Sequence, residues 1–275
     1  MNREILSVSQ YHSAEFKLLI ELLIQRFYPI QILCFAKSST TYTIRTCFGQ
    51  AIDSCKEDYF LLLVTKESTR IEHEIQDFIN AHFKYGIVTV LAHGKKSVLN
   101  ALNTGSRFFT NIYQSGTLLY SSDMMMPTEI TVPDPDTSSF LIDRSHLDHR
   151  FLLIEGFLSG ARACLSKLQY NACLFMLHQA AEQCCLTLIY VYLGYRSNIH
   201  NLRRLLQLCC CFSSEPMKIF LSGTKEDDRL FNILVKSYSQ ARYSDGFSAD
   251  KDDVLLLYKR IESLLELIKS MCVKR

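Results

Sequence analysis

Residues 174–194, LFMLHQAAEQCCLTLIYVYLG, decide the fold class of the C-terminal half of the chain. Apolar residues recur in this stretch at alternating spacings of three and four, which is the period of a helix face that lies in a protein core. The positions that follow this rule are Leu174, Leu177, Ala181, Cys184, Leu188 and Val191. The stretch therefore predicts a helix with a buried apolar stripe.

The same period returns toward the C-terminus and predicts further helices. Residues 250–268 begin with Asp250 and carry a second apolar stripe, formed by Val254, Leu257, Ile261, Leu264, Leu265 and Ile268. Other helices are predicted at 144–168, from about His200, and at 226–241. Five helices joined by short loops indicate an all-α bundle over residues 139–275.

Upstream of the bundle, residues 124–139 read MMMPTEITVPDPDTSS and contain three prolines within 127–135. Proline fits neither the helix nor the strand period, so this segment predicts a linker at 127–138. The chain is thereby divided into an N-terminal domain (1–126) and a C-terminal domain (139–275).

The N-terminal domain shows mixed periods that predict an α/β fold, a small mixed sheet with helices. The run FLLLVT (60–65) is almost wholly apolar, which is typical of a strand covered on both faces. The other predicted elements are helices at 13–27, 68–83 and 95–105 and strands at 31–36, 42–48, 86–93 and 116–122.

The composition of the chain argues against several classes of function. The chain has 275 residues, with 30 Lys and Arg against 28 Asp and Glu, so its formal net charge of +2 encodes no general attraction to polyanions. Its eleven cysteines form no paired CxxC motifs, which favours buried reduced thiols over a metal site. No uncharged apolar run of membrane-spanning length was found, and we expect a cytoplasmic protein without a membrane partner.

Two segments of the C-terminal half resemble the HEPN domain. They are HQAAEQCCLTLIYVYLGYRSNIHNLRRLL (178–206) and YSQARYSDGF (238–247), and the resemblance extends over about 140–272. HEPN domains are often fused to, or encoded beside, minimal nucleotidyltransferases. The resemblance implies RNA or a nucleotide as a ligand and a homodimer formed through the helical domain.

Beside this match, the N-terminal half resembles the minimal nucleotidyltransferase fold. Phe35, Ala36 and Lys37 stand where that family has Phe-Gly-Ser, and Asp58-Tyr59-Phe60 stands where it has Asp-x-Asp. Nucleotidyl transfer in this fold requires two divalent ions held by carboxylates. Phe60 cannot ligate a cation, and the strand at 86–93 contains no acidic residue. We therefore expect a catalytically degenerate domain with no metal and no cofactor, with Mg²⁺ required only if the transferase is active.

In the helical half, six polar residues are predicted to line a cleft that accepts a nucleotide or another anion. His178 and Glu182 share one helix face at spacing i, i+4. The other members are His200, Asn201, Arg242 and Tyr243. The alternative is structural: Glu182 and Arg242 form an ion pair between two helices, while His200 and Asn201 cap the next helix.

Some HEPN domains are metal-independent ribonucleases that pair an arginine with a histidine, with four to six residues between the two. Here Arg242 is present, but Phe247, Ser248 and Ala249 occupy the positions for that histidine. We therefore expect a non-catalytic or regulatory protein associated with RNA or a nucleotide. The alternatives are a HEPN-type ribonuclease, an active nucleotidyltransferase of a toxin–antitoxin-like system, and a structural dimerisation module.

Overall fold

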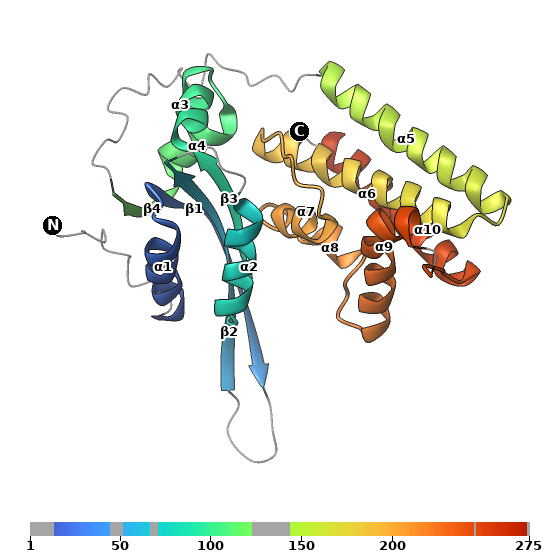
Figure 1. Ribbon diagram of the computed structural model, residues 1–275, viewed down its shortest axis with the longest axis horizontal. Coiled ribbons are helices and arrows are strands. Elements are labelled where there is room, and N and C mark those ends of the chain that lie inside the picture. The colour runs from blue at the N-terminus through green and yellow to red at the C-terminus, as the bar shows by residue number, and fades with distance from the viewer. Residues whose placement is uncertain (1–13, 45–51, 67–70, 123–143, 245, 274–275) are drawn as a thin grey trace. The chain divides into compact units, whose positions relative to one another are not determined.

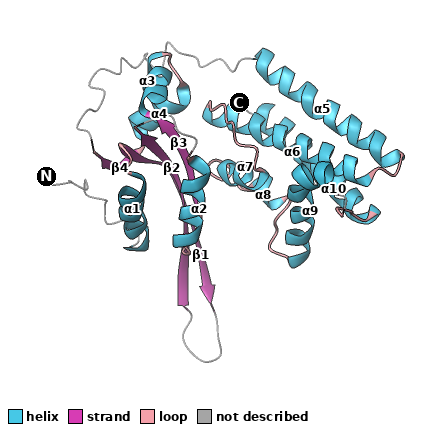
Figure 2. Cartoon of the chain, in the orientation of Figure 1, coloured by secondary structure: helices cyan, strands magenta, loops and turns pink. Residues whose placement is uncertain are grey.

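The computed structural model describes residues 14–44, 52–66, 71–122, 144–244 and 246–273 (Figure 1). The chain divides into two compact units, Met1–Ser138 and Ser139–Arg275. The predicted linker at 127–138 lies outside the described residues. An α/β unit is followed by a helical unit, which confirms the predicted fold class (Figure 2).

A four-stranded mixed sheet with the order β3-β2-β1-β4 forms the centre of the α/β unit. β2 and β3 are parallel, and the other two pairs are antiparallel. The elements are α1 (Ala14–Phe27), β1 (Gln31–Ile44), β2 (Ile52–Thr65), α2 (Glu72–His82), β3 (Val88–Gly94), α3 (Lys95–Asn103), α4 (Arg107–Ser115) and β4 (Thr117–Ser121).

The prediction for the first two strands was wrong in its boundaries. We expected KSSTT (37–41) to separate two strands, but β1 runs through it without a break and pairs with β2 from Gln31 to Ile44. β2 begins at Ile52, well before the predicted start at Phe60. The physical reason is that Thr40 and Thr41 are β-branched and favour an extended backbone once a partner strand supplies its hydrogen bonds.

Apolar side chains cover both faces of β2, as its sequence predicted. On one face Phe16 of α1 stacks on Tyr59, with ring centroids 3.6 Å apart. On the other face the ring centroid of Phe60 lies 6.1 Å from that of Phe35. The ring of Phe35 also contacts the ring of Phe108 in α4, with centroids 5.6 Å apart. This second face requires α4, a helix that the sequence pattern did not predict.

The helical unit is built around α6 (Tyr170–Leu193), which packs against four of the other helices. All six positions of its predicted stripe are fully buried. Gly194 ends the helix with φ 69°, a left-handed conformation that favours glycine. The remaining helices are α5 (Arg144–Ser166), α7 (Leu202–Cys209), α8 (Glu215–Lys218), α9 (Lys225–Tyr243) and α10 (Lys251–Val273).

Among the described residues, α6 is the one helix long and apolar enough to cross a membrane by length and composition. In the structure, 72% of the apolar window of α6 is buried inside the bundle. The core helix of a soluble bundle has the same properties, so these properties alone do not place α6 in a membrane.

Candidate functional site

The two segments that resemble transferase motifs lie opposite one another on β1 and β2. In the antiparallel register Ala36 faces Phe60, Lys37 faces Tyr59 and Ser38 faces Asp58. The register shifts between Cys34 and Ala36, which places Phe35 at a β-bulge. The fold thus brings the two segments together, and their side chains decide what chemistry is available there.

Asp58 is engaged by the backbone of the chain. Its Oδ1 accepts a hydrogen bond of 2.7 Å from the N–H of Ile87, just before β3. Gly86 permits this close approach, because a Cβ at Gly86 would lie 1.8 Å from the carbonyl oxygen of Glu57. Asp58 therefore holds the start of β3 against β2.

Glu57 and Asp58 cannot ligate one ion together from β2. Adjacent side chains of a strand point to opposite faces of the sheet. Glu57 forms an ion pair of 2.5 Å with Lys37 and accepts a hydrogen bond from the Tyr59 hydroxyl. Phe60 is only 2% exposed. Within the described ranges, no group of three or more His, Cys, Asp or Glu side chains is arranged to hold a metal ion.

In the helical unit the predicted polar residues form a different pair from the expected one. Glu182 of α6 is 3% exposed, and its Oε1 lies 3.0 Å from Nδ1 of His200, whose side chain is 64% exposed. Burial raises the pKa of the Glu182 carboxyl, and the hydrogen bond with His200 opposes that rise. Oε2 of Glu182 is buried without a hydrogen-bond partner among the described residues.

His178 lies one turn earlier on α6 and is 1% exposed, with its ring 5.1 Å from that of Tyr238. Burial, together with the smaller effect of the charges of Arg242 and His200, lowers the pKa of His178 to about 4. The imidazole is therefore neutral at pH 7 and enclosed by the bundle.

Arg242, at the end of α9, lies among aromatic rings. Its guanidinium is 5.1 Å from the ring of Phe175, 4.8 Å from that of Tyr238 and 4.9 Å from that of Tyr243. Its Nε donates a hydrogen bond of 2.8 Å to the carbonyl of Tyr238. The alternative of a Glu182–Arg242 ion pair was wrong, because Glu182 is bonded to His200 instead.

Asn201 begins α7 as its N-cap. Its side-chain Oδ1 accepts a hydrogen bond of 3.1 Å from the N–H of Arg204, which satisfies one of the unpaired donors of the first helical turn. The capping role proposed for His200 and Asn201 therefore falls to Asn201 alone. Tyr243 is 80% exposed and lies on the surface beside Arg242.

Sequence reasoning missed two arginines that extend this cluster. Arg150 of α5 donates a hydrogen bond to Oε1 of Gln183. Burial lowers the pKa of the Arg150 guanidinium, and the charge of Glu182 opposes that change. Arg196 follows α6 and lies over the ring of Tyr190, 5.7 Å from its centroid. Arg150 could have been recognised from the sequence. It lies three residues after Leu147 and four before Ile154, so it is an arginine on the apolar stripe of α5.

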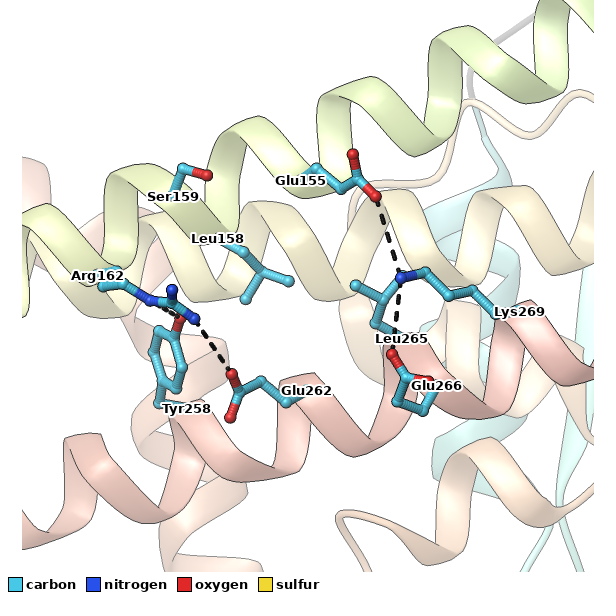
Figure 3. Close-up of a pocket in the computed structure, with 9 residues that line it drawn as sticks. All are labelled: Glu155, Leu158, Ser159, Arg162, Tyr258, Glu262, Leu265, Glu266 and Lys269. Atoms are coloured by element: carbon cyan, nitrogen blue, oxygen red, sulfur yellow. Dashed lines mark hydrogen bonds and ion pairs between the residues drawn. The ribbon is translucent and has the colours of Figure 1, made fainter.

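A groove of about 540 Å³ lies elsewhere, between α5 and α10 (Figure 3). Arg162 crosses it to Glu262 at 3.6 Å, and Lys269 crosses it to Glu155 at 4.0 Å. None of the six predicted site residues lines it. These ion pairs tie α5 to α10, so we assign the groove no part in the candidate site.

Comparisons with known proteins found one matching family and similar solved structures. Residues 155–271 match the HEPN domain family. No curated protein matches the chain. Among solved structures, the chain is similar to an archaeal HEPN homologue, with 20% identity, coverage of 46% of this chain and 97% of that one, and a TM-score of 0.35. It is also similar to a nucleotidyltransferase-like protein from Exiguobacterium sibiricum, with 12% identity, coverage of 91% and 74%, and a TM-score of 0.28.

Proposed function

Because residues 155–271 form a HEPN domain, we propose that this chain is a regulatory protein that binds RNA or a nucleotide, and that its α/β unit does not catalyse nucleotidyl transfer. The binding proposal is carried by Arg242, which is exposed among three aromatic rings at the edge of a polar cluster. Arginine and aromatic side chains together provide the phosphate contact and the stacking surface that nucleotides require.

Loss of catalysis is supported by the use that the fold makes of Asp58. A carboxylate that accepts a backbone N–H at 2.7 Å is engaged in holding β3, and Phe60 fills the position of the second ligand with a buried ring. Hard divalent cations require several oxygen ligands, and the carboxylate next to Asp58 in the chain, that of Glu57, is directed to the other face of the sheet.

Binding can be tested by fluorescence anisotropy with a labelled oligoadenylate and by thermal shift with AMP. We expect Arg242→Ala to weaken the binding of both probes. Arg162→Ala is the matched control, because it removes the same charge from the α5–α10 groove (Figure 3). Equal affinities of wild type and Arg242→Ala for both probes would contradict the proposal.

Loss of catalysis needs a separate assay. Wild-type protein incubated with labelled nucleoside triphosphates and Mg²⁺ should transfer no label to RNA or protein. Transfer that Asp58→Asn abolishes would instead show that Asp58 holds a catalytic ion.

A second candidate function is metal-independent RNA cleavage, which the Glu182–His200 pair favours. A carboxylate that is bonded to an imidazole orients the ring, and the side chain of His200 is exposed, which suits it to act as a general acid or base. His178 is enclosed and less suited to that role. Cleavage of labelled RNA in the presence of a chelator, lost in both His200→Ala and Arg242→Ala, would establish this activity.

The resemblance to HEPN proteins also leads us to propose a homodimer formed through the helical unit. The arrangement of the cysteines, which favours reduced thiols, leads us to propose a cytoplasmic location. Sedimentation equilibrium tests the first proposal: a mass of a single chain across the micromolar concentration range would exclude it there.

A further inference from the structure

The first two strands extend beyond the rest of the sheet. The last residue of β1 that pairs with β4 is Cys34, and the first residue of β2 that pairs with β3 is Tyr59. β1 and β2 stay paired with each other well past these two points. They therefore continue as a two-stranded ribbon beyond the ends of β3 and β4 (Figure 1). We call residues 36–44 of β1 and 52–58 of β2 the β-arm.

A ribbon of two strands is an incomplete β-structure. Two-stranded hairpins are marginally stable in water, and three or more strands or a covering helix are needed for independent stability. α4 packs on β1 at the base of the β-arm, where Phe108 contacts Phe35. Beyond that base, none of the described strands pairs with the outer side of β1 over residues 38–44, a length of roughly 20 Å. This edge can therefore accept another strand.

The edge of the sheet formed by β3 is protected by side chains of α2. Gln76 donates a hydrogen bond of 2.8 Å to the carbonyl of Val88 and accepts one of 3.0 Å from the N–H of Val90. Glu72, one turn earlier on α2, accepts a bond of 3.0 Å from the N–H of Ala92. These side chains occupy the backbone groups with which another strand would pair. The fold thus covers the edge of β3 and leaves the β1 edge of the β-arm open to a partner.

The two strands of the β-arm differ in charge. The β2 strand carries Asp53, Lys56, Glu57 and Asp58, whereas residues 38–44 of β1, SSTTYTI, include no charged residue and no proline. Edge strands commonly carry charges that prevent pairing with another copy, because like charges would then lie opposite one another. Threonine, tyrosine and isoleucine also favour an extended backbone. The β1 strand is therefore the one that can pair with an identical strand.

We propose that the β-arm is a site of self-association, in which residues 38–44 of β1 pair with the same residues of a second copy of the chain. A two-fold axis perpendicular to the sheet makes the two strands antiparallel and joins the two β-arms into one four-stranded sheet. Each copy supplies the third strand that the ribbon of the other requires. This contact belongs to the α/β unit and is separate from the homodimer proposed for the helical unit.

Hydrogen exchange of the full chain at increasing protein concentration locates the contact. A contact along one strand edge is small, so it should dissociate in the micromolar range or above. We expect every second amide of residues 38–44 to exchange about tenfold more slowly at the highest concentration, while the amides of residues 52–56 change little. Protection of these β1 amides at every concentration would show that the same chain covers the edge. That result, or no protection at any concentration, overturns the proposal.

A single substitution tests the size of the assembly. Thr40 is exposed and lies opposite Lys56 in the register of β1 with β2, so Thr40→Glu adds a cross-strand ion pair that keeps the β-arm folded. Between two copies the same substitution brings two carboxylates to the contact. We expect sedimentation equilibrium to give Thr40→Glu about half the mass of wild type. Gln114→Glu, the same charge change at an exposed residue of α4, should leave the mass unchanged.

The masses also distinguish this contact from the homodimer of the helical unit. If both contacts form, wild type exceeds the mass of a dimer and Thr40→Glu returns it to a dimer. If the β-arm contact forms alone, wild type is a dimer and Thr40→Glu is a single chain. Equal masses of wild type and Thr40→Glu across the micromolar range overturn the proposal, whatever the helical unit does.

Discussion

Replacing Asp58 tests whether its carboxylate is a structural acceptor. Asp58→Ala removes the acceptor of the 2.7 Å bond from the Ile87 N–H and leaves that donor partly buried without a partner. Hydrogen bonds to charged groups contribute about 1.5–3 kcal/mol, so the α/β unit should lose roughly that much stability. Asp58→Asn keeps an oxygen at the same position and should cost less than about 1 kcal/mol.

Urea unfolding of the full chain, with hydrogen exchange at the β3 amides to assign the transition to the α/β unit, measures this difference. Asp77→Ala, an exposed carboxylate on α2, serves as the matched control and should change stability by less than about 0.5 kcal/mol. The reasoning is refuted if Asn is as destabilising as Ala, or if Mg²⁺ stabilises wild type and not Asp58→Asn. Either result would mean that Asp58 acts through its charge, as a metal ligand does.

Three further predictions concern single residues. Gly86→Ala should destabilise the α/β unit by several kcal/mol, because the new Cβ would lie 1.8 Å from a backbone carbonyl oxygen, whereas Gly156→Ala, with open space on α5, should stabilise by about 0.5–1 kcal/mol in urea unfolding. The folded pKa of His178, about 4, lies below its unfolded value of 6.5, so the folded protein holds this ring neutral and its free energy of unfolding should fall as the pH drops from about 6.5 to 4. The difference in pKa corresponds to roughly 3 kcal/mol. His178→Gln should remove this pH dependence from a series of unfolding curves. Asn201→Ala should lower the melting temperature through loss of about 1 kcal/mol of helix capping, while Asn198→Ala, an exposed residue just upstream, should leave it unchanged.

The sequence pattern alone predicted an element correctly where the buried positions follow the period of that one helix or strand. The stripes of α6 and α10 and the apolar run of β2 were predicted because each position repeats the same environment every three or four residues, or along one strand. The strand boundaries were harder. Thr40 and Thr41 belong to β1 because β2 pairs with them. The packing role of α4 is visible only in the tertiary structure, where its Phe108 contacts Phe35 beside β2.

The candidate site shows the same division. The sequence established that His178 and Glu182 share a helix face, and that Asp58 has no second carboxylate two residues later. It could not assign partners, because each decisive contact joins residues far apart in the chain: Glu182 with His200, Asp58 with the Ile87 N–H, and Arg242 with the ring of Phe175. Which charges meet is set by how the helices and strands pack, since a side chain's spacing fixes its direction on its own element and nothing about what lies opposite.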